Sequence, residues 1–345
     1  MSALAVEEVP PPASLYVHFP FCSHRCHYCD FAVHRTDEPP FEAWLECIVR
    51  ELESWFRRAG WVRPQPLDSV FVGGGTPSLM GDRMGRLAEA LHRGFVLDRD
   101  PVEWTAESNP ASLDADVARS WRDAGVNRLS VGVQSFDDDV LRWLGRLHDA
   151  DGARRALVAA RSAGFENLNA DLIFGLPSPI ERDWRAEVES VLEAGVTHVS
   201  TYGLTAEAQT PLGRRVSSGD VSMVGGEGYA AEYLSVVEAL ESAGFLLYEV
   251  SNFALPGCEC LHNWHYWDGA PYLGIGPSAH SFLGGRRVWN VSRWEAYREL
   301  LEGGHGPVEG HELLGAGESQ LERLWLALRT AQGIAAGDPL TRSIV

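Results

Sequence analysis

The sequence predicts an α/β fold, a partial parallel (β/α)6 barrel with a small helical region at its C-terminal end. Two observations support this prediction. Short apolar, β-branched runs alternate with amphipathic segments along most of the chain, at connection lengths that are usual for βα units. Polar or glycine-rich residues follow almost every apolar run, where the carboxyl ends of parallel strands would form one rim.

The expected elements follow one another from residue 14 to residue 251. Strands are expected at 14–19, 68–72, 102–107, 128–133, 167–173, 197–203 and 246–251. Helices are expected at 40–58, 82–94, 114–124, over most of 137–163, at 181–194 and at 228–243. Right-handed βα repeats of this number curl into a whole or partial barrel, with the functional site at the carboxyl ends of the strands.

The chain divides into four predicted regions. Residues 1–13 include three consecutive prolines, lack periodicity and are expected to form a flexible tail. Residues 14–250 are expected to form the barrel core, and residues 251–285 complete it. Residues 286–345 are expected to be a helical C-terminal region, which looks short for a separate domain.

Composition narrows the classes of function. The chain has 345 residues, of which 45% are hydrophobic, as in a large globular protein. Its 29 Lys and Arg against 48 Asp and Glu give a formal charge of −19, which makes nucleic acid an unexpected partner. No apolar run approaches the roughly 20 residues that cross a bilayer, so no transmembrane segment is expected, while peripheral membrane contact stays open. Six cysteines without a secretory leader favour a reducing compartment, the cytoplasm.

Three cysteines directly after the first expected strand are the strongest chemical signal. Cys22, Cys26 and Cys29 have the spacing CxxxCxxC. Three thiolates on one loop could hold three irons of a 4Fe-4S cluster and leave the fourth iron open to another ligand. A zinc site completed by a nearby histidine is equally consistent with this spacing, and three unconnected thiols are the remaining alternative.

Glycines and carboxylates follow later strands. Residues 73–75 are three glycines followed by Thr76, and such a turn lets a ligand approach the backbone, although a tight βα turn needs glycine for geometry alone. Glu107 and Asp171 lie at the end of, or within, apolar strands, where burial is costly unless a cation or several donors are present. Asp171 could accept two ribose hydroxyls.

Two further polar residues follow the fourth strand. Gln134 could bond a ribose or an adenine edge, and Arg146 could balance a ligand carboxylate. Each could equally cap the element beside it. Their shared place at strand ends is the reason to include them in a candidate site.

The cysteine loop and the motifs GGGTP, ESNP, GVQSF and DLIFGLP, in this order over residues 14–285, resemble the radical S-adenosylmethionine (SAM) family. The resemblance is to the branch that contains the oxygen-independent coproporphyrinogen III oxidases and the haem chaperones of the HemW family. It implies the TIM-like partial barrel of radical SAM proteins. It also favours a cluster over zinc, with Cys22, Cys26 and Cys29 as its ligands.

The same resemblance implies how SAM is held. The methionine part of SAM would chelate the open iron of the cluster through its amine and carboxylate. The implied cofactor-binding residues are Tyr16, Tyr28, Gly74, Gly75, Thr76, Glu107, Gln134, Arg146 and Asp171. Among them Asp171 would take the ribose, while Thr205 and His280 match family positions near the adenine more loosely.

Two sequence features distinguish the coproporphyrinogen oxidases of this branch from its haem chaperones. Coproporphyrinogen oxidases of the family typically have one more cysteine, in a CxxxCxxCxC pattern, whereas here Asp30 and Phe31 follow Cys29 as in the haem chaperones. Residues 262–267 reproduce the chaperone pattern HNxxYW, which implies that haem is bound through His262. Cys258 and Cys260 are expected to be exposed thiols, and Cys47 a buried apolar residue.

The expected function is therefore that of a haem chaperone. It would bind a 4Fe-4S cluster, SAM and haem, and it would pass haem to an acceptor haemoprotein, with an electron donor required if SAM is cleaved. The alternative is an enzyme, an oxygen-independent coproporphyrinogen III oxidase that forms protoporphyrinogen IX by oxidative decarboxylation. A structural zinc protein is disfavoured by the ordered motifs at the strand ends.

Overall fold

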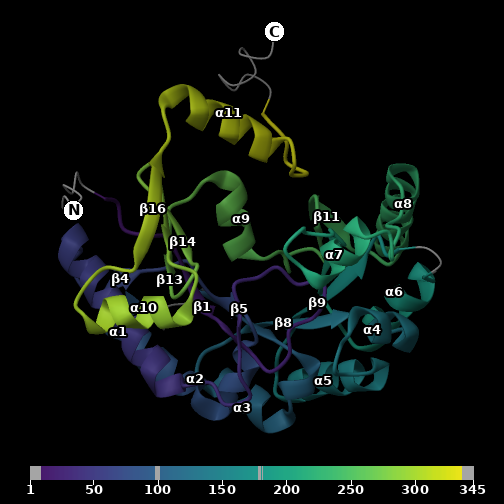
Figure 1. The fold of residues 1–345 in the computed structure, drawn as a ribbon, viewed down its shortest axis with the longest axis horizontal. Coiled ribbons are helices and arrows are strands. Elements are labelled where there is room, and N and C mark those ends of the chain that lie inside the picture. The colour runs from purple at the N-terminus through teal and green to yellow at the C-terminus, as the bar shows by residue number, and fades with distance from the viewer. Residues whose placement is uncertain (1–8, 98–101, 178–179, 181, 336–345) are drawn as a thin grey trace.

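The computed structural model describes residues 9–97, 102–177, 180 and 182–335. Within these residues one curved sheet of twelve strands forms the frame of the molecule. Figure 1 shows most helices along the convex side of the sheet and one helix, α9 (Leu261–Asp268), on the concave side near its centre. The site discussed below lies inside this curve.

Six parallel strands make up the centre of the sheet and pair in the order of the sequence. They are β1 (Ser14–Phe19), β5 (Ser69–Gly74), β7 (Glu103–Ser108), β8 (Arg128–Gln134), β9 (Asn167–Phe174) and β10 (His198–Gly203). These strands lie where the sequence predicts them. The prediction of an α/β fold with a partial parallel (β/α)6 barrel is confirmed.

The outer helices alternate with these strands as expected. They are α1 (Phe41–Ala59), α2 (Met84–His92), α3 (Ala115–Asp123), α4 (Asp138–Leu144), α5 (Ala150–Ser162), α6 (Trp184–Glu193) and α8 (Gly226–Ser242). Aspartates cap four of them, because the side chains of Asp114, Asp137, Asp149 and Asp183 accept first-turn N–H groups. Between these helices and the sheet lies the main apolar core, which includes Trp44, Trp121 and the β8 side chains of Leu129, Val131 and Val133 that face the helices.

Antiparallel strands extend the sheet at both edges. Beyond β10 lie β12 (Asn252–Ala254) and β11 (Leu246–Glu249), so the last strand of the predicted repeat is antiparallel to its neighbour. Beyond β1, β13 (Tyr272–Ile275) is parallel, and β14 (His280–Leu283), β15 (Arg286–Asn290) and β16 (Val308–Leu313) are antiparallel.

The region 286–345 differs from the expectation of a helical segment. Two of its elements are the strands β15 and β16, which continue the main sheet, and two are the helices α10 (Trp294–Glu302) and α11 (Ala316–Ala327). Gly284 and Gly285 adopt positive φ angles in the turn between β14 and β15, which lets two short strands pair. Residues 336–345 lie outside the described part of the chain.

The expected flexible tail falls partly on residues 1–8, which are outside the described part. From Val9 onward the chain packs on the barrel, because the Val9 carbonyl accepts a hydrogen bond of 2.9 Å from Trp61 Nε1. The Ala13 N–H donates to the Pro271 carbonyl at 2.8 Å. In the described ranges, no helix has the length and apolar character needed to cross a bilayer.

Candidate functional site

A cavity of about 660 Å³ lies at the carboxyl ends of the central strands. Most of the predicted site residues line it, although they come from loops far apart in the sequence. These residues are Cys22, Cys26, Tyr28, Cys29, Gly74, Gly75, Thr76, Glu107, Gln134, Arg146 and Asp171. Thr205, one of the two looser matches, lines it as well, whereas His280 lies on β14, where it stacks with Trp289.

The three cysteines of the loop after β1 open into this cavity as free thiols. Burial raises the pKa of the Cys22 thiol to about 11 and raises that of Cys29. Hydrogen-bonding groups also reach the sulfurs: Thr76 Oγ1 lies 3.2 Å from Cys22 Sγ, and Arg146 Nη1 donates to Cys26 Sγ at 3.5 Å. Three thiols on one loop, with donors that stabilise thiolates, fit a group bound through three soft ligands.

The cysteine loop is held in place by two helices. His27 Nε2 donates to the Trp143 carbonyl of α4 at 2.6 Å, and the His27 carbonyl accepts from the Leu212 N–H at 2.9 Å. Leu212 belongs to α7 (Pro211–Ser217), which the sequence reasoning missed. The signal was present, since Thr210 caps this helix and Pro211 occupies its first turn.

Close packing explains the glycine turn after β5. The N–H groups of Gly75 and Thr76 donate to the carbonyls of Phe19 and Phe21, each at 2.8 Å. A Cβ atom on Gly75 would lie 2.6 Å from the Phe21 carbonyl oxygen, so only glycine allows this approach. The turn therefore needs glycine for its geometry and also offers backbone to the cavity.

Two carboxylates face the same cavity. Glu107 Oε2 accepts the Gly74 N–H at 3.0 Å, and Asp171 accepts from Ser130 Oγ at 3.1 Å and from Asn169 Nδ2 at 2.8 Å. Burial, followed by the charge of Asp171, raises the pKa of Glu107 to about 7, and burial raises the pKa of Asp171. A cationic group bound between them would lower the cost of two neighbouring negative charges.

Gln134 and Arg146 complete this side of the cavity. Arg146 Nη2 donates to the Gly132 carbonyl at 2.9 Å, so the guanidinium ties the end of β8 to the cysteine loop. Gln134 has a φ of 68°, in the left-handed region that side chains other than glycine rarely adopt. The pairing of β8 with β9 shifts register between Val131 and Gln134.

Tyr16 and His262 lie elsewhere. Both line a second cavity of about 220 Å³, deeper inside the curve of the sheet. Glu107, Asp171 and Tyr202 line both cavities, so the two adjoin. The Tyr16 hydroxyl lies 3.1 Å from His18 Nδ1. Tyr16, which is expected beside the cofactor, does not line the cavity with the cysteines but shares the second cavity with Glu107 and Asp171.

His262 is 1% exposed and belongs to the helix α9, which the sequence analysis did not predict. Its Nδ1 lies 2.8 Å from Ser69 Oγ and its Nε2 lies 2.9 Å from the Tyr266 hydroxyl. Burial lowers the pKa of His262 to about 3. Because both ring nitrogens are engaged, ligation of iron by His262 requires that α9 first releases one of these hydrogen bonds.

The amino ends of the strands hold α9. Ser69 is the first residue of β5, and Glu103, the first residue of β7, accepts the N–H groups of Leu261 at 2.8 Å and His262 at 3.0 Å. The cavity with the cysteines lies at the other ends of these six-residue strands, about 17 Å away. The two motifs therefore occupy opposite ends of the barrel.

The other cysteines separate into two kinds. Cys47 is 2% exposed and packs in the main core, as predicted. Cys260 is 3% exposed, so the expectation of two exposed thiols is wrong for this residue. It occupies the N-cap position of α9, and its thiol donates to Glu103 Oε1 at 3.3 Å. Cys258 is half-buried.

Comparisons with known proteins agree with this geometry. Residues 16–191 match the model of the radical SAM superfamily. The chain is 39% identical over 336 residues to "Heme chaperone HemW" of Mycobacterium tuberculosis, covering 96% of this chain and 84% of that protein. It is 35% identical over 326 residues to HemW of Bacillus subtilis, covering 93% and 84%.

Among solved structures, the fold resembles that of coproporphyrinogen III oxidase (HemN) from Escherichia coli, described as a radical SAM enzyme. The superposition has a TM-score of 0.80 at 23% identity and covers 94% of this chain and 77% of that one. At this identity the likeness concerns the fold alone.

Proposed function

Because this chain belongs to the radical SAM superfamily and, within it, to the HemW haem chaperone family, we propose that it binds a 4Fe-4S cluster, SAM and haem and transfers haem to an acceptor haemoprotein. The cytoplasm would be its compartment. An electron donor is needed only if SAM is cleaved.

The single observation that supports the cofactor part is the shared cavity. Cys22, Cys26 and Cys29 would hold the cluster, which supplies an open iron and one-electron chemistry when bound. Glu107 would balance the positive charge of SAM, and Asp171 would accept its ribose hydroxyls. Tyr28, Gly74, Gly75, Thr76, Gln134 and Arg146 would form the remaining walls. Tyr16 would support Glu107 from the adjoining cavity.

Haem would bind at α9. His262 would ligate the iron after leaving Ser69 or Tyr266, and the half-buried rings of Trp264 and Trp267 would cover part of the porphyrin. Opening of α9 is then part of the binding reaction. Its free-energy cost lowers the apparent affinity for haem in the closed protein.

The proposal is tested by titrating haem into cluster-loaded protein. We expect His262→Ala to weaken binding, and Ser69→Ala to strengthen it, because Ser69 competes with iron for the imidazole. His92→Ala, at the exposed end of α2, serves as the control. Equal haem spectra and affinities in all four proteins would place the haem site away from α9.

A second experiment distinguishes the haem chaperone from the alternative, a coproporphyrinogen III oxidase. Reconstituted protein is incubated with coproporphyrinogen III, SAM and a reductant, and the products are analysed. We expect no turnover. If the protein forms protoporphyrinogen IX and the Cys26→Ala variant does not, the oxidase function is correct and the chaperone proposal is wrong.

A further inference from the structure

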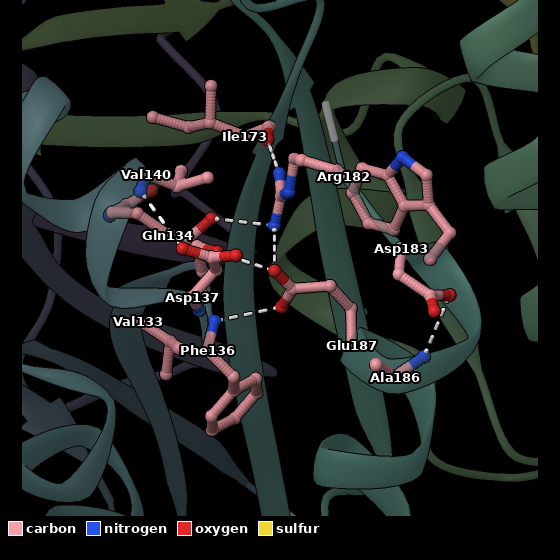
Figure 2. A network of polar contacts seen from close by, with 12 residues as sticks. Val133, Gln134, Phe136, Asp137, Val140, Ile173, Arg182, Asp183, Ala186 and Glu187 are labelled. Atoms are coloured by element: carbon pink, nitrogen blue, oxygen red, sulfur yellow. Dashed lines mark hydrogen bonds and ion pairs between the residues drawn. The ribbon is translucent and has the colours of Figure 1, made fainter. Parts of the chain in front are cut away.

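A buried ion pair lies directly behind the wall of the larger cavity. Arg182 precedes α6 and Glu187 lies in its first turn, and their side chains are 1% and 4% exposed. Arg182 Nη2 lies 2.8 Å from Glu187 Oε1. Figure 2 shows the pair beside the ends of two strands, with Gln134 and Phe136 next to it and Ile173 above the guanidinium in this view.

The pair contacts backbone on both strands. Arg182 donates through Nη1 to the Ile173 carbonyl and through Nη2 to the Gln134 carbonyl at 3.3 Å. Glu187 accepts the Phe136 N–H at 2.8 Å and the Ser135 hydroxyl. The two side chains thus hold the last residue of β8, the turn after it and the end of β9 in one arrangement (Figure 2).

This part of the sheet needs such support. The regular pairing of β8 with β9 is interrupted before Gln134, and Gln134 has a left-handed φ of 68°. A residue with a side chain stays in that conformation only when its surroundings fix it. Gln134 and Ile173 both line the cavity that the proposed cofactors would occupy.

The chemistry of the ion pair indicates that it positions the backbone around it more than it stabilises the fold. A buried ion pair loses hydration on folding, and apolar side chains of similar size often stabilise a fold as well. Apolar side chains could not bond two carbonyls and a carboxylate at once, which a planar guanidinium does. Trp184 fixes the guanidinium further, with its ring centroid 4.2 Å from Arg182 Cζ.

We propose that Arg182 and Glu187 are positioning residues for SAM, which hold Gln134 and Ile173 in the conformation that binds the cofactor. The inference rests on the proposed function of the cavity. It assigns the pair no contact with SAM itself. Its effect on SAM passes through Gln134.

The test compares SAM binding in cluster-loaded variants, by calorimetry and by the change that SAM causes in the EPR spectrum of the reduced cluster. The main variant is Arg182→Met with Glu187→Gln, which removes both charges but leaves an acceptor for the Phe136 N–H. We expect the Kd for SAM to rise about tenfold, while the iron content and the spectrum without SAM stay native. Arg287→Met with Glu322→Gln removes an ion pair between β15 and α11 and should leave the Kd unchanged.

A double-mutant cycle with Gln134→Ala tests the route of the effect. If the pair acts through Gln134, the double substitution has little further effect on the Kd in the Gln134→Ala background. Full additivity, or a native Kd in the double variant, would overturn the proposal. If the double variant does not fold, Arg182→Lys decides, because lysine keeps the charge but cannot bridge both carbonyls, and a native Kd there also overturns it. Failure of the unsubstituted protein to bind SAM would instead reject the proposed function, and the inference with it.

Discussion

Glu107 and Asp171 place two carboxylates in one cavity, and this sets the pH range in which a cationic ligand binds. Burial and the nearby charge of Asp171 raise the pKa of Glu107 to about 7, and the Gly74 N–H only partly opposes them. Below that pH Glu107 is mostly protonated and loses the charge that would attract a cation. Above it Glu107 is mostly ionised and can attract a cation.

We therefore expect the affinity for SAM to fall as the pH decreases from 8 to 6, by at most about tenfold per pH unit for this one group. In Glu107→Gln the affinity should be lower at pH 8 and the dependence on pH weaker. Calorimetric titration at several pH values measures both. The exposed substitution Glu238→Gln is the control, and an equal slope in Glu107→Gln would contradict the assignment.

Gln134 has a left-handed backbone conformation, and substitutions there can distinguish the effect of backbone strain on stability from the effect of the side chain on SAM binding. Gln134→Gly should keep the free energy of unfolding within about 1 kcal/mol of native, because relief of the backbone strain offsets the greater freedom of the unfolded glycine. Gln134→Val should lose more than about 1 kcal/mol, since a β-branched side chain tolerates this φ poorly. Urea unfolding measures these differences.

Both substitutions at Gln134 should weaken SAM binding, because both remove the amide. SAM binding of native strength in Gln134→Gly would show that the residue is needed only for its backbone. The matched control is Ser278, the other positive-φ residue with a side chain in the described part of the chain. Ser278→Gly should leave SAM binding unchanged.

Residue spacing predicted the members of this site but not their depth. The CxxxCxxC spacing and the order of the strand-end motifs pointed to this rim, and the family resemblance implied which residues meet in the larger cavity. Tyr16, expected beside SAM, and His262, expected at haem, both line the second cavity and are covered by other elements. A tyrosine within a strand does not reveal which layer packs over its ring.

At the scale of elements, α9 is the clearest departure from the sequence prediction. Its eight residues have aromatic and polar side chains on every face, so no apolar periodicity marks a helix. Its contacts also come from far away in the chain, since Ser69 and Glu103 lie 193 and 159 residues before His262. The βα repeats were predicted because each signal is local, whereas α9 depends on tertiary contacts.

Three buried histidines predict how acid affects the cluster-free protein. Burial lowers the pKa of His262 to about 3, of His18 to about 4 and of His198 well below its usual value. The unfolded chain binds these protons near pH 6.5 while the folded chain does not. The contribution of these histidines to stability is therefore full above about pH 6.5 and falls as the pH decreases toward their folded pKa values.

Replacing His262 by glutamine should make this fall shallower by at most about 1.4 kcal/mol per pH unit, the effect of one proton. The slope does not vanish, since His18 and His198 remain. Urea unfolding of cluster-free protein at pH 7.5, 6 and 5 gives the slopes. His24→Gln, an exposed substitution, should keep the native slope, and a native slope in His262→Gln would show that this ring is accessible to protons in the folded state.

At the scale of the whole molecule, the C-terminal strands belong to the barrel. Glu51 of α1 is fully buried and accepts from the Gly276 N–H at 2.9 Å, from Asn290 Nδ2 at 2.7 Å and from the Tyr297 hydroxyl at 2.6 Å. Asn290 and Tyr297 belong to β15 and α10, more than two hundred residues after Glu51. Such long-range contacts explain why the sequence suggested a separate helical region.

We expect that a chain ending at Gly285 loses at least about 3 kcal/mol of stability, because Glu51 stays buried without two of its donors and the sheet loses β15 and β16. A chain ending at Leu314 lacks only the segment with α11, a helix that buries no side chain, and should stay within about 1 kcal/mol of the full chain. Glu51→Gln in the full chain should fall between the two.

Urea unfolding and iron content after reconstitution give the measurements. The full chain should unfold in one transition that includes the C-terminal strands, since one sheet runs through both parts. A chain ending at Gly285 that keeps native stability and a full cluster would show that residues 286–345 form a separate unit. Loss of stability in that chain, with native behaviour in the chain ending at Leu314, would place the boundary of the cooperative unit after β16.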